Sequence, residues 1–64
     1  MKIRDVLKRL QEDGWYEVRR RGSHRVLQHD RKPGIVVVPG HLSDDIAPGT
    51  LKSIRDQAQL GGRL

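Results

Sequence analysis

The chain has 64 residues, a mass of 7.3 kDa and a net charge of +5, from 13 lysines and arginines against 8 acidic residues. This length allows a single domain, residues 1–64, and excludes a Rossmann enzyme, a barrel and any two-domain catalyst. The absence of cysteine excludes a disulfide framework and a thiolate zinc site. No apolar run approaches the roughly 18 residues of a membrane span or resembles a signal peptide, so we expect a cytoplasmic protein that does not contact membranes.

The excess positive charge lies entirely in the first half of the chain. Residues 1–32 contain ten basic and five acidic residues, whereas residues 33–64 contain three of each. The densest cluster consists of Arg19, Arg20, Arg21 and Arg25. Such clustering is typical of a surface that binds nucleic acid, and the alternative is a solvated surface that keeps a small protein soluble. We favour nucleic acid as the partner.

Residues 3–13 are predicted to form the first helix. Four apolar residues recur at the spacing of one helix face: Ile3, Val6, Leu7 and Leu10. Gly14 is a suitable end for this helix, because glycine readily adopts the left-handed conformation found there.

Residues 15–21 and 24–29 are predicted to form two strands, joined by a tight hairpin turn at Gly22-Ser23. Regular alternation would place Tyr16, Val18 and Arg20 on one face, and Trp15, Glu17, Arg19 and Arg21 on the other. Trp15 and Val18 both resemble core residues, yet they have opposite parity. Either a bend in the strand or a role for Trp15 in capping the helix would resolve this conflict.

Residues 35–38 give the third strand, with four β-branched residues in a row. Because the run does not alternate with polar residues, either both of its faces are covered or one is offered to a partner. A turn at residues 30–34 precedes this strand, and Pro39 ends it.

The last helix is predicted to start at Pro48 and to end at Gly61-Gly62. In the loop before it, Asp44 and Asp45 are interpreted as negative charges that complement the dipole of this helix. The fold class is therefore α+β with the order α-β-β-β-α. Three consecutive strands make an antiparallel sheet, and the two helices must bury their apolar stripes on one face of it. This is the arrangement of double-stranded-RNA-binding domains.

Gly22-Ser23-His24-Arg25 is the sharpest chemical motif, because a small turn presents a hydroxyl, an imidazole and a guanidinium together. Arginine binds phosphate oxygens and stabilises developing negative charge, and histidine exchanges protons near neutral pH. RNA supplies its own nucleophile, the 2′-hydroxyl. This combination suits phosphodiester cleavage, and the alternative is that His24 is an ordinary polar turn residue.

The other two histidines are weaker candidates. His29 lies five residues, about 17 Å, along the strand from His24 and on the opposite face, so we expect an exposed residue at the strand end. His41 follows Pro39 in a loop and can cap the last helix or shape that loop, and a direct role in catalysis is the weaker alternative. No histidine pair has the spacing of a helical metal site, and Asp44-Asp45 alone is too weak to make one. We expect no metal and no cofactor.

Taken together, these motifs resemble the HicA family of toxins, small mRNA interferases of toxin–antitoxin modules. The matching features are, in order, a helix ending at Gly14-Trp15, Arg19, Gly22-Ser23-His24, Val38-Pro39 followed by His41, and Gly49-Thr50-Leu51-Lys52-Ser53-Ile54. Gly-Ser-His alone is a weak motif, but this series within so short a chain is specific.

The resemblance implies a double-stranded-RNA-binding-like fold, translation-independent cleavage of mRNA, and neutralisation by a HicB antitoxin. It implies that His24 is the catalytic residue. The expected RNA-binding residues are Arg19, Arg20, Arg21, Ser23 and Arg25. Val26 and Leu27 stand where the family has aromatic residues, which weakens the case for base stacking there.

Two other functions remain open at this stage. The chain can be a non-catalytic RNA-binding module of the same fold, or an inactive toxin. The enzyme is favoured because His24 lies at a flexible turn and few aromatic residues are available for stacking. A binder of double-stranded RNA would also need a basic cluster on its last helix, which offers only Lys52 and Arg55.

Overall fold

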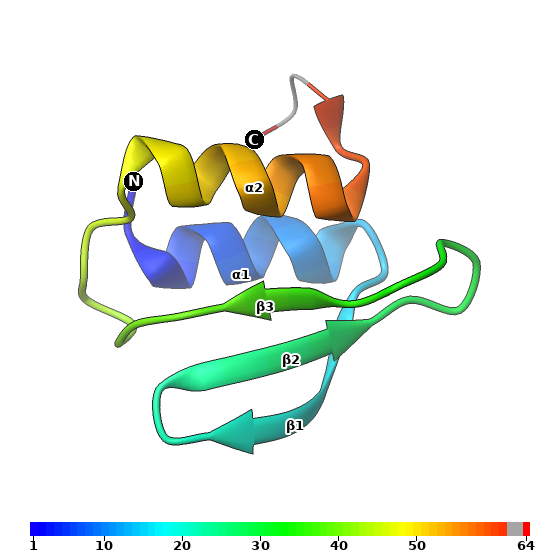
Figure 1. The fold of residues 1–64 in the computed structure, drawn as a ribbon, viewed down its shortest axis with the longest axis horizontal. Helices are drawn as coiled ribbons and strands as arrows, with labels where there is room; N and C mark the ends of the chain where they lie inside the picture. Colours follow the sequence, from blue (N-terminus) through cyan, green and yellow to red (C-terminus); the bar gives the residue numbers. More distant parts are fainter. Residues whose placement is uncertain (62–63) are drawn as a thin grey trace.

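The computed structural model describes residues 1–61 and 64, and its elements follow the predicted order. They are helix α1 (Ile3–Glu12), strands β1 (Tyr16–Arg21), β2 (His24–Gln28) and β3 (Val36–Val38), and helix α2 (Pro48–Ala58) (Figure 1). The strands form one antiparallel sheet in the order β1-β2-β3. The predicted α+β class and the three-stranded antiparallel sheet are confirmed.

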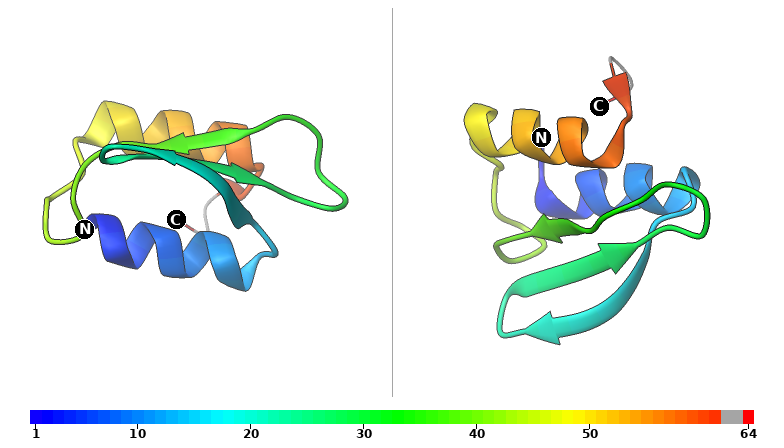
Figure 2. Two further views of the ribbon diagram at one scale, coloured as in Figure 1. Left: turned by 90° about the horizontal axis from the view of Figure 1, so that it is seen from below. Right: turned by 45° about the vertical axis from the view of Figure 1, so that its right-hand side comes forward.

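A single hydrophobic core joins both helices to one face of the sheet. Helix α1 crosses that face, and α2 lies next to β3 (Figure 2). The core residues are Ile3, Val6, Leu7, Leu10, Trp15, Leu27, Val36, Val38, Ile54, Ala58 and Leu60. In β3 only alternate residues enter this core, so Val37 points to the other face and remains partly exposed. Within the described residues, no helix covers the opposite face of the sheet.

Helix α1 starts and ends through local hydrogen bonds that its sequence specifies. The Asp5 carboxylate accepts a hydrogen bond from the Lys2 backbone N–H at 3.2 Å. At the other end Gly14 has a φ of 105°, and the Trp15 N–H donates to the Leu10 carbonyl at 3.0 Å. A side chain at position 14 would place its Cβ 2.8 Å from Nε2 of His29, so glycine is required there for space as well as for conformation.

Strand β1 contains a bulge, and this corrects the predicted alternation. Trp15 precedes the strand and is 1% exposed, whereas Val18 is 45% exposed and lies where the register shifts between Glu17 and Arg19. The expectation of Val18 in the core is therefore wrong. Because the bulge adds one residue to β1, Arg19 changes face relative to a regular strand.

The acidic pair Asp44-Asp45, in the loop before α2, interacts with the start of α1 and not with the first turn of α2. The first turn of α2 contains no acidic residue, so the predicted complement to its dipole is wrong. Asp45 forms an ion pair with Lys2 at 3.1 Å. The Asp44 carbonyl accepts a hydrogen bond from the Ile3 N–H at 2.9 Å. The pair thus joins the loop to the N-terminal end of α1.

Helix α2 ends earlier than the glycine pair predicts. It stops at Ala58, and Gln59 takes the left-handed conformation with a φ of 55°. Leu60 then folds back into the core. Of the predicted Gly61-Gly62 end, Gly62 lies outside the described residues. Within the described part of the chain, neither helix is long and apolar enough to cross a membrane.

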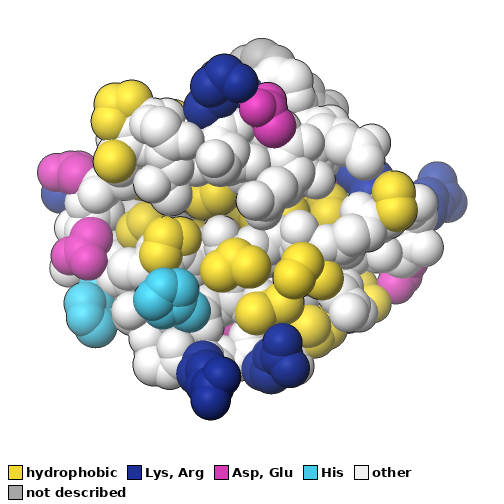
Figure 3. Space-filling view, viewed as in Figure 1, with side chains coloured by type: hydrophobic (Ala, Val, Ile, Leu, Met, Phe, Trp, Pro, Cys, Tyr) yellow, Lys and Arg dark blue, Asp and Glu magenta, His cyan; other side chains and the backbone are white. Residues whose placement is uncertain are grey.

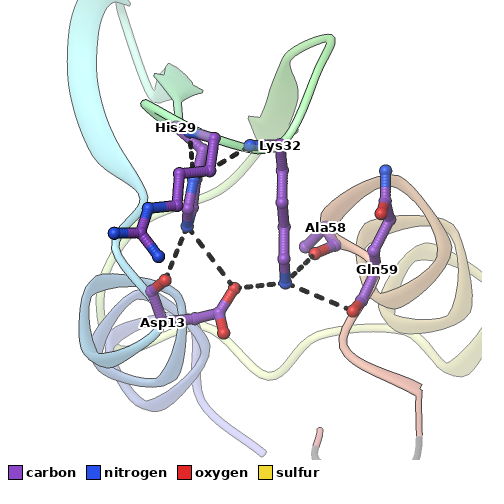
Figure 4. A network of polar contacts seen from close by, with 6 residues as sticks. Asp13, His29, Lys32, Ala58 and Gln59 are labelled. Atoms are coloured by element: carbon purple, nitrogen blue, oxygen red, sulfur yellow. Dashed lines mark hydrogen bonds and ion pairs between the residues drawn. The ribbon is translucent and has the colours of Figure 1, made fainter.

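The loop between β2 and β3 ties the ends of both helices together (Figure 4). Lys32 Nζ lies 2.5 Å from Asp13 Oδ2 at the end of α1, and donates to the carbonyl oxygens of Ala58 at 3.0 Å and Gln59 at 3.3 Å. The last two oxygens belong to the end of α2, where a positive charge is favourable. A single ammonium group therefore bridges three segments.

His29 belongs to this same structural unit. Its side chain is 10% exposed, so the prediction of an exposed residue at the strand end is wrong. Nδ1 accepts hydrogen bonds from the backbone N–H groups of Arg31 and Lys32 at 3.0 and 3.1 Å, which leaves the proton on Nε2 to be donated to the Asp13 carbonyl at 2.7 Å. The ring also packs edge-on against Trp15, with 5.2 Å between ring centroids. All of its polar atoms are used by the fold.

Candidate active site

The hairpin turn that joins β1 to β2 presents the Gly-Ser-His motif. Gly22 has a φ of 58°, and Ser23 does not share this left-handed conformation, which is the pattern of a type II′ turn. Such a two-residue turn matches the twist of the flanking strands and fixes their register. His24 is the first residue of β2 and pairs directly with Arg21.

Because of the bulge, two arginines share the outer face of the sheet with His24. The cross-strand pairs Arg21–His24 and Arg19–Val26 have their side chains on this face. An open hollow there is lined by Arg19, Arg20, Arg21, His24 and Val26. Figure 3 shows histidine and basic side chains at the border of a group of hydrophobic side chains on the exposed sheet face. The structure thus brings together four of the six predicted site residues, and Ser23 lies in the adjoining turn.

The His24 side chain is exposed and makes no hydrogen bond or ion pair with any other described residue. This contrasts with His29, whose ring nitrogens are both occupied. An imidazole without a protein partner, beside several guanidinium groups, is available to a phosphodiester that binds in the hollow.

Arg25 is separated from the other predicted RNA-binding residues. It lies on the core side of β2 and is 7% exposed. Its Nε is 3.6 Å from Oε1 of Glu17, and its Nη1 donates to the Gly40 carbonyl at 3.0 Å. This guanidinium already has protein partners on two sides.

Arg20 has an intermediate position. By register it belongs to the core side of β1, where its Nη2 contacts Glu17 Oε1 at 3.2 Å. Its side chain is nevertheless exposed and borders the hollow. Because the pair with Glu17 is at the surface, it competes only weakly with a phosphate for this guanidinium.

The outer face also has an apolar part, which the sequence indicated only at residues 35–38. Tyr16, Val18 and Ile35 are exposed, and Val26 and Val37 are half-buried there without a covering element. The Tyr16 hydroxyl donates to Asp30 Oδ1 at 3.1 Å, and this hydrogen bond raises the pKa of Tyr16. The signal was present in the uninterrupted β-branched run at 35–38, which predicted either two covered faces or one face open to a partner.

His41 lies in the loop after β3, exposed and at the same end of the sheet as the Gly22-Ser23 turn. Its backbone N–H donates to Asp44 Oδ2 at 3.0 Å. Among residues 1–61 and 64, no group of three or more His, Asp or Glu side chains is placed to hold a metal ion.

Comparison with known proteins identifies the family. The family model described as the HicA toxin of bacterial toxin–antitoxin systems matches residues 3–60, nearly the whole chain. No curated protein matches the chain. The matched region includes both helices, the sheet and the turn that carries His24, and the chain belongs to the HicA toxin family.

Proposed function

We propose that this HicA-family toxin is an endoribonuclease that cleaves mRNA in the cytoplasm with His24 as its catalytic residue. The observation that supports this most directly is the exposed His24 imidazole, which has no polar partner among the described residues and lies at an arginine-lined hollow. Because no described protein group occupies this imidazole, it is free to exchange a proton with a phosphodiester bound in the hollow.

The chemistry that fits this site is transesterification within the RNA chain. A ribose 2′-hydroxyl gives up its proton to a base, and its oxygen forms a bond to the adjacent phosphorus. The bond from phosphorus to the 5′-oxygen breaks, and that oxygen takes a proton from an acid. The products are a 2′,3′-cyclic phosphate and a 5′-hydroxyl. His24 moves one of these two protons.

Arg19 and Arg21 are proposed to bind the phosphate whose charge increases as the reaction proceeds. They flank His24 on the same face, and guanidinium groups are suited to phosphate oxygens. Arg20 and Ser23 border the same region and are proposed to contribute further contacts. Arg25, whose guanidinium is buried, is proposed to support this site from the core side.

The proposed partner is a HicB-type antitoxin. A toxin of a toxin–antitoxin system needs a partner that blocks it, and the uncovered sheet face offers both charge and apolar area. We expect the antitoxin to be acidic where it meets Arg19 and Arg21, because burial of unpaired guanidinium groups is costly. Its apolar residues would cover Val26 and Val37.

The substitution His24→Ala tests the catalytic role. General acid–base catalysis contributes about 10²- to 10⁴-fold, so cleavage of a labelled RNA is expected to fall by that factor. The matched control is Gln28→Ala, an exposed residue of the same strand and the same face, which is expected to leave the cleavage rate unchanged. Circular dichroism would establish that both variants are folded.

The alternative, a non-catalytic RNA-binding module, gives a different result in the same experiment. The purified wild-type chain would bind RNA without cleaving it, and His24→Ala would change affinity alone. A folded His24→Ala variant that cleaves at the wild-type rate would show that another residue is the catalyst.

A further inference from the structure

The proposed cleavage moves two protons, and His24 moves only one of them. Arg25 and the loop that follows β3 indicate which residue moves the other. We propose that His41 is this group, and that Arg25 is the positioning residue that holds its loop beside His24. The inference rests on the proposed ribonuclease function, which requires one base and one acid at the same phosphate.

The sheet register brings the two histidines to one end of the molecule. Arg25 pairs with Val38 across β2 and β3, a separation of about 5 Å between Cα atoms. His24 directly precedes Arg25, and His41 follows Val38 by three residues. Figures 1 and 2 show the Gly22-Ser23 turn and the loop after β3 at the same end of the sheet.

Arg25 fixes this arrangement from the inside. Its Nη1 donates to the carbonyl of Gly40, the residue before His41, at 3.0 Å. A buried guanidinium is costly unless it is paired, and here Glu17 of β1 lies 3.6 Å from Nε. The side chain therefore connects β1, β2 and the loop, and it does so between the positions of the two histidines.

The loop itself is held on its other side by α1. The Ile3 and Arg4 N–H groups donate to the carbonyls of Asp44 and Leu42 at 2.9 and 3.1 Å. Gly40 has a φ of 91°, so a residue without a side chain makes the turn toward His41. A proton-transfer group on this loop has a backbone fixed at several points, as catalysis requires.

Both imidazoles are available to the substrate. His24 and His41 are exposed, and neither side chain makes a hydrogen bond or ion pair within residues 1–61 and 64. The charged groups next to them differ in sign. Arg19, Arg20 and Arg21 line one hollow with His24, whereas the Asp44 carboxylate accepts a hydrogen bond from the His41 backbone N–H. Asp45 of the same loop is paired with Lys2.

In the proposed reaction the two histidines act on opposite sides of one phosphate. One takes the proton of the 2′-hydroxyl as the 2′-oxygen bonds to phosphorus. The other gives a proton to the 5′-oxygen as its bond to phosphorus breaks. After the step one imidazole has gained a proton and the other has lost one, and exchange with water restores both.

The first experiment measures kcat and KM for His41→Ala over a range of pH. We expect kcat to fall about 10²- to 10⁴-fold with little change in KM, and the pH profile to lose one of its two limbs. Ser43→Ala, an exposed position in the same loop, is the matched control and is expected to match the wild type. Wild-type kinetics and both limbs retained in His41→Ala would overturn this inference alone. A wild-type chain that does not cleave RNA would overturn the proposed function and the inference with it.

A substrate with sulfur in place of the 5′-oxygen separates the two roles, because a thiolate leaves without protonation. Cleavage of this substrate is expected to recover in only one of the variants His24→Ala and His41→Ala, the one that lacks the acid. Recovery in neither variant would overturn the pairing of the two histidines.

Arg25 is tested by substitutions that keep or remove its donor. Arg25→Met is expected to lower kcat by about 10²-fold, since small displacements of a catalytic group have effects of that size, and to diminish the limb that His41→Ala removes. Arg25→Lys keeps a cation toward Gly40 and is expected to recover part of the rate. A folded Arg25→Met variant with the wild-type pH profile would refute the positioning role. If it does not fold, Glu17→Gln loosens Arg25 from the other side and is measured in the same way.

Discussion

The substitution Lys32→Met tests whether one cation holds the two helix ends together. Methionine retains most of the length and apolar character of the lysine stem, so the main change is loss of the ammonium group. That group lies against the Asp13 carboxylate and the carbonyls of Ala58 and Gln59. The side chains of Lys32 and Asp13 are only 23% and 11% exposed, so solvent screens the pair weakly.

The size of the expected effect follows from these contacts. Hydrogen bonds to charged groups contribute about 1.5–3 kcal/mol, and loss of one partner of a buried pair costs about 3–5 kcal/mol. Because Lys32 is partly exposed, we expect a loss of about 2–3 kcal/mol in the free energy of unfolding. A domain of this length has about 3–10 kcal/mol in total, so Tm is expected to fall by about 10–20 °C.

Thermal and urea unfolding followed by circular dichroism would measure this loss. The control is Lys52→Met, which removes the same group from an exposed pair with Asp56 that has an N–O distance of 2.9 Å. This pair lowers the pKa of Asp56, yet both side chains are in solvent, so Tm is expected to change little. Equal Tm values for the two variants would refute the structural role of Lys32.

Three further predictions concern the reaction and its control. Cleavage is expected to continue in excess EDTA and to leave 2′,3′-cyclic phosphate ends, because RNA supplies the nucleophile; loss of activity that magnesium restores would contradict this. Arg19→Gln and Arg21→Gln are each expected to reduce the slope of log affinity against log salt by about 0.7, whereas Arg25→Met leaves it unchanged, and equal slopes for all three would show that the outer face does not bind phosphate. Diethylpyrocarbonate is expected to modify His24 more slowly in the antitoxin complex than in the free toxin, and equal rates would mean that inhibition does not depend on covering the site.

Local patterns were sufficient to predict the order of elements in this fold. The apolar spacing of α1, the Gly22-Ser23 turn and the β-branched run of β3 each specify their structure within a few residues. The bulge in β1 was not predictable, because the energy that selects it comes from packing Trp15 into the core while Arg19 and Arg21 face outward. The alternation of residues along the strand showed that Trp15 and Val18 could not both face the core of a regular strand. It did not show which of the two does.

The candidate site was also predictable only in part from the sequence. The Gly-Ser-His motif identified the turn, and charge clustering identified its arginines. Sequence proximity grouped Arg25 with them, although adjacent residues of a strand point to opposite faces, and the core side of β2 gives Arg25 different partners. The structural role of His29 depends on Asp13 and Trp15, which are distant in sequence, so no local pattern could reveal it.

The bulge in β1 divides that strand into two segments. In each segment side chains alternate between the core and the outer face, but the alternation does not continue from one segment into the other. Up to Glu17, the residue that suits each position depends on the core that Trp15 enters. From Arg19 onward, it depends on the hairpin turn and on His24. A scan of substitutions along β1 would therefore not follow one two-residue period; it would show two such periods, offset at Val18. Removal of that one residue would merge the two periods into one, because Arg19 would then follow Glu17 directly and the arginines would keep their partners and their outer face.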